Sequence, residues 1–136
     1  MAKESALDQE KVRRALEEIE REGVKFVNLQ FTDLMGMVKH VTIPAHELED
    51  TLEHGKWFDG SSIEGFARVH ESDMYLEPDL DTFGLIPNLG SRFLTAKVTC
   101  NVFTPDGEPF LGDPRYILGL ALREAEEMGF RFYVGP

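Results

Sequence analysis

The chain has 136 residues, enough for one domain or for one small domain and part of another. Hydrophobic residues make up 42% of it and charged residues 29%, which indicates a globular protein and argues against disorder. The 25 acids against 14 Lys and Arg give a formal net charge of −11. Such a charge repels phosphate backbones and anionic lipid surfaces, so we expect no nucleic-acid partner and no membrane partner.

The cysteine count and the N-terminus restrict the compartment. Cys100 is the only cysteine, which excludes an intramolecular disulfide, and its apolar surroundings predict a buried small hydrophobe. Residues 1–11 are charged and lack the apolar core of a secretory signal. No apolar run approaches the ~20 residues of a membrane helix. We expect a cytoplasmic protein.

The first half of the chain predicts a helix, a hairpin and a second helix. Apolar residues at helical spacing favour a helix over residues 8–22, with a glycine cap at Gly23. Residues 24–31 and 37–43 predict two strands joined by a turn at 33–36. Pro44 opens a short helix that ends at Gly55.

The middle of the chain predicts further strands. Residues 73–76 and 83–86 are expected to form short strands on either side of a turn at 78–81. Residues 96–103 predict a longer strand, closed by a turn at 105–107. Mixed strands with one or two helices indicate an α+β sheet domain that ends near residue 104.

The last thirty residues follow a different pattern. Asp113 and Pro114 form a strong helix start, with the aspartate as N-cap and the proline in the first helical position. The predicted helix is apolar on nearly every side, and residues 130–134 predict a strand after it. A helix followed by a buried strand is typical of the opening of a further α/β domain, so we expect a chain truncated within that domain.

The stretch KWFDGSSIEGF, residues 56–66, sets a carboxylate at the mouth of a small polar loop. Trp57 and Phe58 precede Asp59, and Gly60 lets a ligand approach the backbone closely. Aromatic neighbours can partly desolvate the carboxylate. An Asp-Gly pair taken alone is most often a turn, so a structural turn and a ligand site both remain open.

The acids at the end of this stretch and after it do not predict a metal site. They comprise Glu64, Glu71, Asp73, Glu77, Asp79 and Asp81. An EF-hand that began at Asp79 would place Phe83 and Gly90 where oxygen ligands are needed, so a solvated acidic loop is favoured. The sequence has no HExxH, no GxxxxGK[ST] and no GxGxxG. The lone cation among these acids, Arg68, is either an ion-pair partner for one of them or a binding group for a substrate carboxylate or phosphate.

The segment FDGSSIEGFARVHESDMYLEPDLDTF, residues 58–83, resembles the signature of bacterial and archaeal type I glutamine synthetases. NLQFTDLMGMVKHVTIP, HELEDTLEHG, GDPRYIL and FRFYVGP agree with the same family in order. The resemblance covers nearly the whole chain. It implies an N-terminal β-grasp (ubiquitin-like) domain over residues 1–104 and the incomplete beginning of a catalytic domain over residues 105–136.

The resemblance also implies roles for four residues. Asp59 would bind ammonium and help to remove its proton, so that the amine attacks a γ-glutamyl phosphate made from glutamate and ATP. Ser62 would line the same entrance, and Arg68 would lie near the substrate pocket. Asp73 would lie in a loop that shapes the neighbouring subunit's active site.

The family pattern continues beyond the final Gly-Pro into a Glu-x-Glu that supplies metal ligands, and the sequence stops before it. The resemblance therefore implies that magnesium or manganese and ATP bind the full-length enzyme, that this chain alone binds neither tightly, and that it is inactive alone. The intact enzyme is expected to be a dodecamer-like ring. The alternative is a non-catalytic β-grasp module that binds a partner such as a full-length synthetase.

Overall fold

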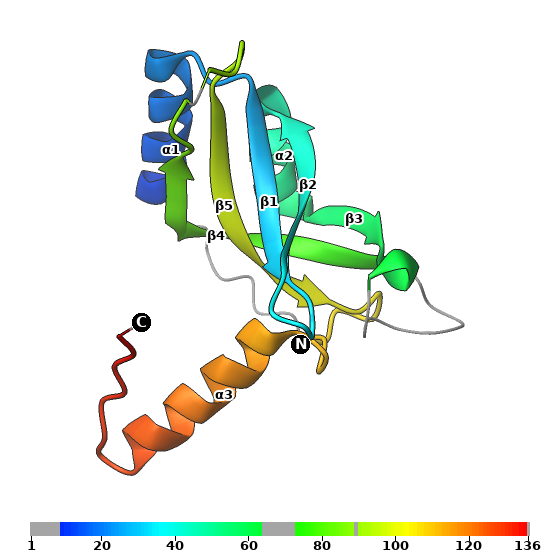
Figure 1. Ribbon diagram of the computed structural model, residues 1–136, viewed down its shortest axis with the longest axis vertical. Coiled ribbons are helices and arrows are strands. Elements are labelled where there is room, and N and C mark those ends of the chain that lie inside the picture. Colours follow the sequence, from blue (N-terminus) through cyan, green and yellow to red (C-terminus); the bar gives the residue numbers. More distant parts are fainter. Residues whose placement is uncertain (1–8, 64–72, 89, 136) are drawn as a thin grey trace.

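The computed structural model describes residues 9–63, 73–88 and 90–135. These residues form a five-stranded sheet in the order β2–β1–β5–β4–β3 (Figure 1). The strands are β1 (Phe26–Thr32), β2 (Val38–Pro44), β3 (Lys56–Asp59), β4 (Asp73–Leu85) and β5 (Thr95–Phe103). β1 and β5 are parallel, whereas the other neighbouring strands are antiparallel. The expected α+β mixed sheet is confirmed.

The hairpin between β1 and β2 is fixed by a buried aspartate. Asp33 is 3% exposed, and its Oδ1 accepts hydrogen bonds from the backbone N–H groups of Met35 (2.9 Å) and Met37 (2.8 Å). Gly36 has a φ of 81°, which few other residues adopt easily. The predicted hairpin is confirmed, with its strands shifted by one or two residues.

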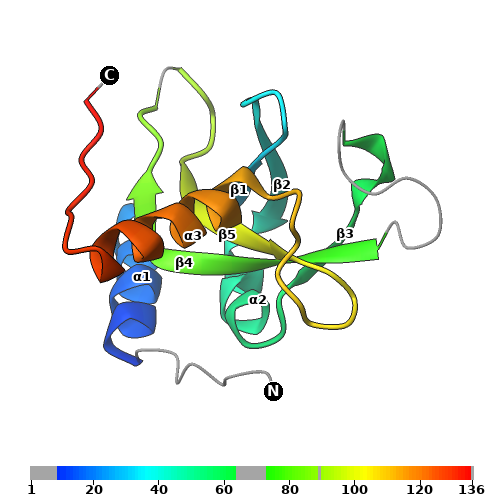
Figure 2. The same ribbon diagram turned by 90° about the horizontal axis from the view of Figure 1, so that it is seen from below.

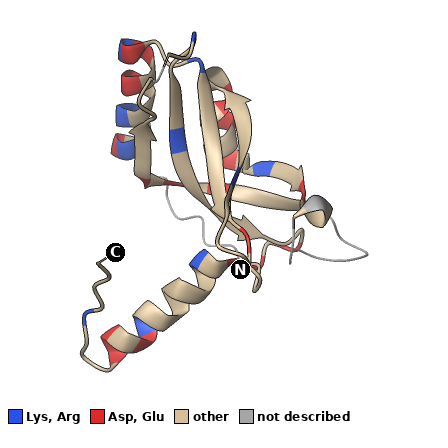
Figure 3. Cartoon of the chain, viewed as in Figure 1, with Lys and Arg blue, Asp and Glu red and all other residues tan. Residues whose placement is uncertain are grey.

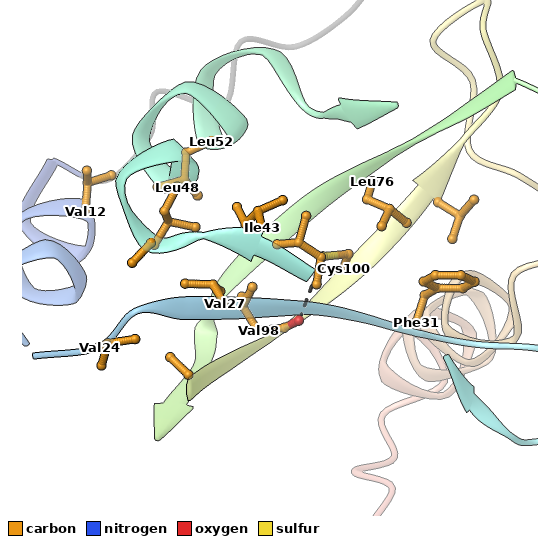
Figure 4. Packing of buried hydrophobic residues seen from close by; sticks show 14 of the residues in the cluster. Val12, Val24, Val27, Phe31, Ile43, Leu48, Leu52, Leu76, Val98 and Cys100 are labelled. Atoms are coloured by element: carbon orange, nitrogen blue, oxygen red, sulfur yellow. Dashed lines mark hydrogen bonds between the residues drawn. The ribbon is translucent and has the colours of Figure 1, made fainter. Parts of the chain in front are cut away.

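Helices α1 (Gln9–Glu22) and α2 (Leu48–His54) share one apolar core with the sheet. Val12 of α1 and Leu48 of α2 pack with Val27 and Ile43 from the strands (Figure 4). Figure 3 shows acids and bases along α1, and most of these charged residues are exposed whereas Val12 and Ala15 are buried, as the helical spacing predicts. Both predicted helices are confirmed, the second preceded by a 3-10 turn, η1 (Ala45–Glu47).

The sheet curls strongly. Figure 1 shows β1, β2 and β5 running lengthwise, with β3 and the adjoining part of β4 running across them. The rings of Phe31 on β1 and Phe58 on β3 lie 5.0 Å apart between centroids, although two strands separate β1 from β3 in the sheet. The curl brings β3 toward the β1–β2 hairpin.

The predicted turn at 78–81 is wrong. β4 continues through these residues, and its pairing with β5 shifts register between Asp79 and Gly84. Pro78 is tolerated because the pairing of β4 with β3 ends at Leu76, and no other described strand pairs with that edge of β4 beyond this point. Pro78, which suggested a turn in the sequence, therefore lies in a bulged strand. β3 itself was expected to be part of a loop.

The C-terminal region has little contact with the sheet. Helix α3 (Pro114–Glu127) begins at the predicted N-cap, where Asp113 Oδ1 accepts from Arg115 N at 3.0 Å. α3 has no buried residue, and it projects from the sheet with the tail beyond it (Figures 1 and 2). The strand predicted at 130–134 is wrong: these residues are irregular and exposed. A strand needs a neighbour for its backbone hydrogen bonds, and the described residues supply none there.

Candidate functional site

Asp59 is the last residue of edge strand β3 and the N-cap of the 3-10 turn η2 (Gly60–Ser62). Its Oδ1 accepts a hydrogen bond from Ser61 N at 2.9 Å, the side-chain-to-backbone bond typical of an aspartate turn. The residue is exposed. Phe58 packs toward Phe31, and Trp57 is itself 53% exposed, so these two rings leave the carboxylate of Asp59 exposed.

Asp73, the first residue of β4, lies directly opposite Asp59 in the antiparallel pairing of β3 and β4. Directly paired side chains point to the same face, with Cβ atoms about 5 Å apart. Two carboxylates in this arrangement repel each other, and a cation between them relieves the repulsion. The fold thus brings together two of the four residues selected from the sequence.

A shallow hollow of about 410 Å³ lies beside Asp59. Its walls come from Phe58 and Ile63 on one side and from β2, including Lys39 and His40, on the other. The hollow exists because the curled sheet brings β3 near the hairpin. Lys39 and His40 could not be assigned to this site from the sequence, since only the curl places them beside Asp59.

Two selected residues cannot be placed. Arg68 lies outside the described residues, as does the side chain of Ser62, although the backbone of Ser62 belongs to η2. Their predicted roles remain predictions.

Other ionisable groups cluster where α3 meets the sheet. Asp113 is fully buried, and its Oδ2 accepts from Val102 N at 3.1 Å. Burial raises the pKa of the Asp113 carboxyl above its usual value. Arg115 Nη2 lies 2.6 Å from Asp79 Oδ2. Burial also raises the pKa of the Cys100 thiol to about 12, so this residue is a core hydrophobe, as predicted, and a poor nucleophile.

The described residues do not fit a magnesium or manganese ion. Within 9–63, 73–88 and 90–135, no three His, Cys, Asp or Glu side chains are grouped closely enough to surround a metal. In the same ranges, no helix is long and apolar enough to cross a bilayer.

A row of aromatic side chains was not predicted from the sequence. Trp57, Tyr75 and Phe103 are cross-strand neighbours on β3, β4 and β5. Residues two apart in a strand point the same way. The spacing of Asp73, Tyr75 and Glu77 at every second position of β4 could therefore have predicted that these three side chains share one face of the sheet.

Comparison with known proteins agrees with this fold and these motifs. Residues 23–105 match the family described as "Glutamine synthetase, beta-Grasp domain". A glutamine synthetase of Methanosarcina mazei is 49% identical over 121 residues, which cover 89% of this chain and 27% of that protein. One from Thermotoga maritima is 50% identical over 118 residues, 87% of this chain and 27% of that protein. The chain thus spans about a quarter of the length of these relatives.

A solved structure supports the same fold. The cryo-EM structure of Plasmodium falciparum glutamine synthetase matches with a TM-score of 0.74 at 24% identity, covering 86% of this chain and 23% of that one. At this identity the likeness concerns the fold alone. The family match covers most of the chain, and the relatives share about half of their aligned residues with it. The chain belongs to the glutamine synthetase family, and its sheet is the family's β-grasp domain.

Proposed function

We propose that this chain is the N-terminal part of an enzyme that joins ammonium to glutamate in an ATP-dependent ligation. In this proposal it supplies one wall of an active site that a neighbouring subunit completes. The carboxylate pair of Asp59 and Asp73 at the exposed end of the β3–β4 pairing carries the proposal. The identity of about 50% to curated glutamine synthetases supports the same activity.

The carboxylate pair suits both steps that ammonium must undergo. A fixed negative charge attracts the small cation, and Asp73 opposite Asp59 strengthens that attraction. Ammonium must lose a proton before its nitrogen can attack an acyl carbon, and a carboxylate within hydrogen-bond reach can accept that proton. We assign the first contact and the proton to Asp59, because η2 fixes its side chain through Ser61 N.

The hollow beside Asp59 is open to solvent, which is consistent with a wall that another polypeptide surface covers. The described residues do not fit the metal, so we assign ATP and the metal to other parts of the longer enzyme. We also propose a cytoplasmic, ring-shaped homo-oligomer, in which Ser62 and Arg68 lie near the same entrance. The domain boundary near residue 104 belongs to this proposal.

A chimera tests the proposal. This chain replaces the corresponding segment of the Thermotoga maritima relative, to which it is 50% identical. We expect the chimera to form glutamine, and Asp59→Asn to lower the rate by about 10²–10⁴-fold, the range typical of lost general-base assistance.

Asp106→Asn is the matched control, since Asp106 is an exposed carboxylate in the turn after β5. It should leave the rate unchanged. An active Asp59→Asn chimera, or equal losses in the two variants, would show that Asp59 has no special role. The 136-residue chain alone is expected to release no ADP from ATP with glutamate and ammonium above a heat-inactivated sample.

A further inference from the structure

A row of three aromatic rings crosses the sheet on the face opposite the core. The centroids of Trp57 and Tyr75 are 5.3 Å apart, and those of Tyr75 and Phe103 are also 5.3 Å apart, with the latter rings stacked at 11°. Met74 and Leu76, which flank Tyr75 along β4, are buried in the core. Side chains alternate along a strand, so the aromatic row faces outward.

Acidic side chains continue this face along β4. Glu77 and Asp79 follow Tyr75 at two-residue steps and point the same way. Burial raises the pKa of Glu77 above its usual value, so its ionised form would gain from a nearby positive charge. We call Trp57, Tyr75, Phe103, Glu77 and Asp79 the acidic–aromatic face.

One arginine of the chain already binds at the end of this face. Arg115, at the start of α3, holds Asp79 through Nη2 and Oδ2 at 2.6 Å. Glu77 has no ion-pair partner among the described residues. Trp57 remains 53% exposed although its ring contacts Tyr75, so the open part of the face combines an aromatic surface with an unneutralised carboxylate.

We propose that the acidic–aromatic face binds an arginine- or lysine-bearing segment of a partner polypeptide. A cation over a Trp or Tyr ring is attracted by the ring's negative face, and a carboxylate beside the ring adds a charge-assisted hydrogen bond. Arginine fits best, because its planar guanidinium stacks on rings and donates to carboxylates at once. The net charge of −11 adds long-range attraction for a cationic segment. This binding does not depend on the proposed role of Asp59.

Trp57 is the only tryptophan, so its fluorescence reports directly on the face. The probe is the peptide acetyl-Arg-Gly-Arg-amide, and the matched peptide carries citrulline, the uncharged isostere, in place of each arginine. We expect a saturable fluorescence change with the arginine peptide that weakens as salt is added. The citrulline peptide should bind about tenfold more weakly or worse, because it makes no hydrogen bonds between charged groups.

Two variants and a control separate this face from the general negative charge of the chain. Tyr75→Leu should weaken binding about two- to fivefold through loss of the cation–ring contact. Glu77→Gln should weaken peptide binding similarly without disturbing the aromatic row. If Tyr75→Leu does not fold, Glu77→Gln alone tests the role of the face. Glu53→Gln removes one exposed carboxylate from α2 and should change nothing.

Equal binding of the two peptides, no saturable change in the unaltered chain, or equal weakening by Glu53→Gln and Glu77→Gln would each overturn the inference. None of these outcomes bears on Asp59, whose test uses ammonium and a chimeric enzyme.

Discussion

The curled sheet and the C-terminal region differ in how they use apolar residues. In the sheet and its two helices, side chains such as Leu29, Leu48 and Leu76 are completely buried. In α3 and the tail, Leu118 is 51% exposed and Tyr133 is 83% exposed. Apolar content is high in both regions, so it does not decide burial.

What decides burial is a second layer of structure. The sheet is covered by α1 and α2 on one face, whereas nothing among the described residues covers α3. α3 is nevertheless helical, because Asp113 caps it locally and Arg115 ties it to Asp79. Helix formation can be local, but the burial of an apolar helix requires another surface.

The largest expected effect comes from cutting a core side chain. Leu29→Ala should lower the free energy of unfolding by about 2–5 kcal/mol, because it leaves a cavity in a fully buried site. Leu118→Ala in α3 should change it by no more than about 0.5 kcal/mol. Urea denaturation of both variants provides the measurement. Similar losses would mean that α3 is packed in solution.

The junction between the two regions should be the next most sensitive point. Asp113→Ala removes the acceptor for Val102 N and Arg115 N and leaves a buried donor unsatisfied. We expect a loss of about 1–3 kcal/mol in the free energy of unfolding, measured by urea denaturation. Asp106→Ala is the control, and a loss no larger than in this control would contradict the role of Asp113.

Removal of residues 117–136 tests whether the sheet needs the C-terminal region. Asp113 and Arg115 are retained, so the sheet should lose about 0.5 kcal/mol or less. Self-association should fall, because exposed apolar side chains such as Leu118 and Tyr133 are removed. Sedimentation velocity measures the second effect. An unfolded product would show that the sheet needs the C-terminal region.

The smallest effect concerns Glu77. Its pKa is raised by burial in the folded chain, so the protonated form stabilises the fold at low pH and this contribution is lost as pH rises through the folded pKa. Glu77→Gln should therefore increase thermal stability slightly at pH 7, and the difference should vanish near pH 4. Melting temperatures at both pH values check this. A variant that is less stable than the parent chain at pH 7 would contradict the assigned cause.

Features that depend on nearby residues could be predicted from the sequence. The amphipathic helix α1, the hairpin turn at Asp33 and the N-cap at Asp113 all follow from local spacing and were expected. The strand at 130–134 was predicted wrongly, because its apolar pattern carries no information about a neighbouring strand.

Features that depend on distant pairing could not be predicted. β3 has only four residues and is defined by its pairing with β4, across the undescribed residues 64–72. The same pairing places Asp73 opposite Asp59. The identity of both carboxylates followed from the family resemblance, whereas their juxtaposition required the register of the sheet.

A comparison of Michaelis constants in the chimeric enzyme tests the proposed role of Asp59. If Asp59 attracts ammonium and accepts its proton, Asp59→Asn should raise the KM for ammonium, while the KM for ATP and the melting temperature should barely change. Formation of γ-glutamyl phosphate, which needs no ammonium, should be affected much less than glutamine formation. If Asp59 only shapes the turn at η2, the KM values for all three substrates should change equally and the melting temperature should fall. That result would contradict the proposed role of Asp59.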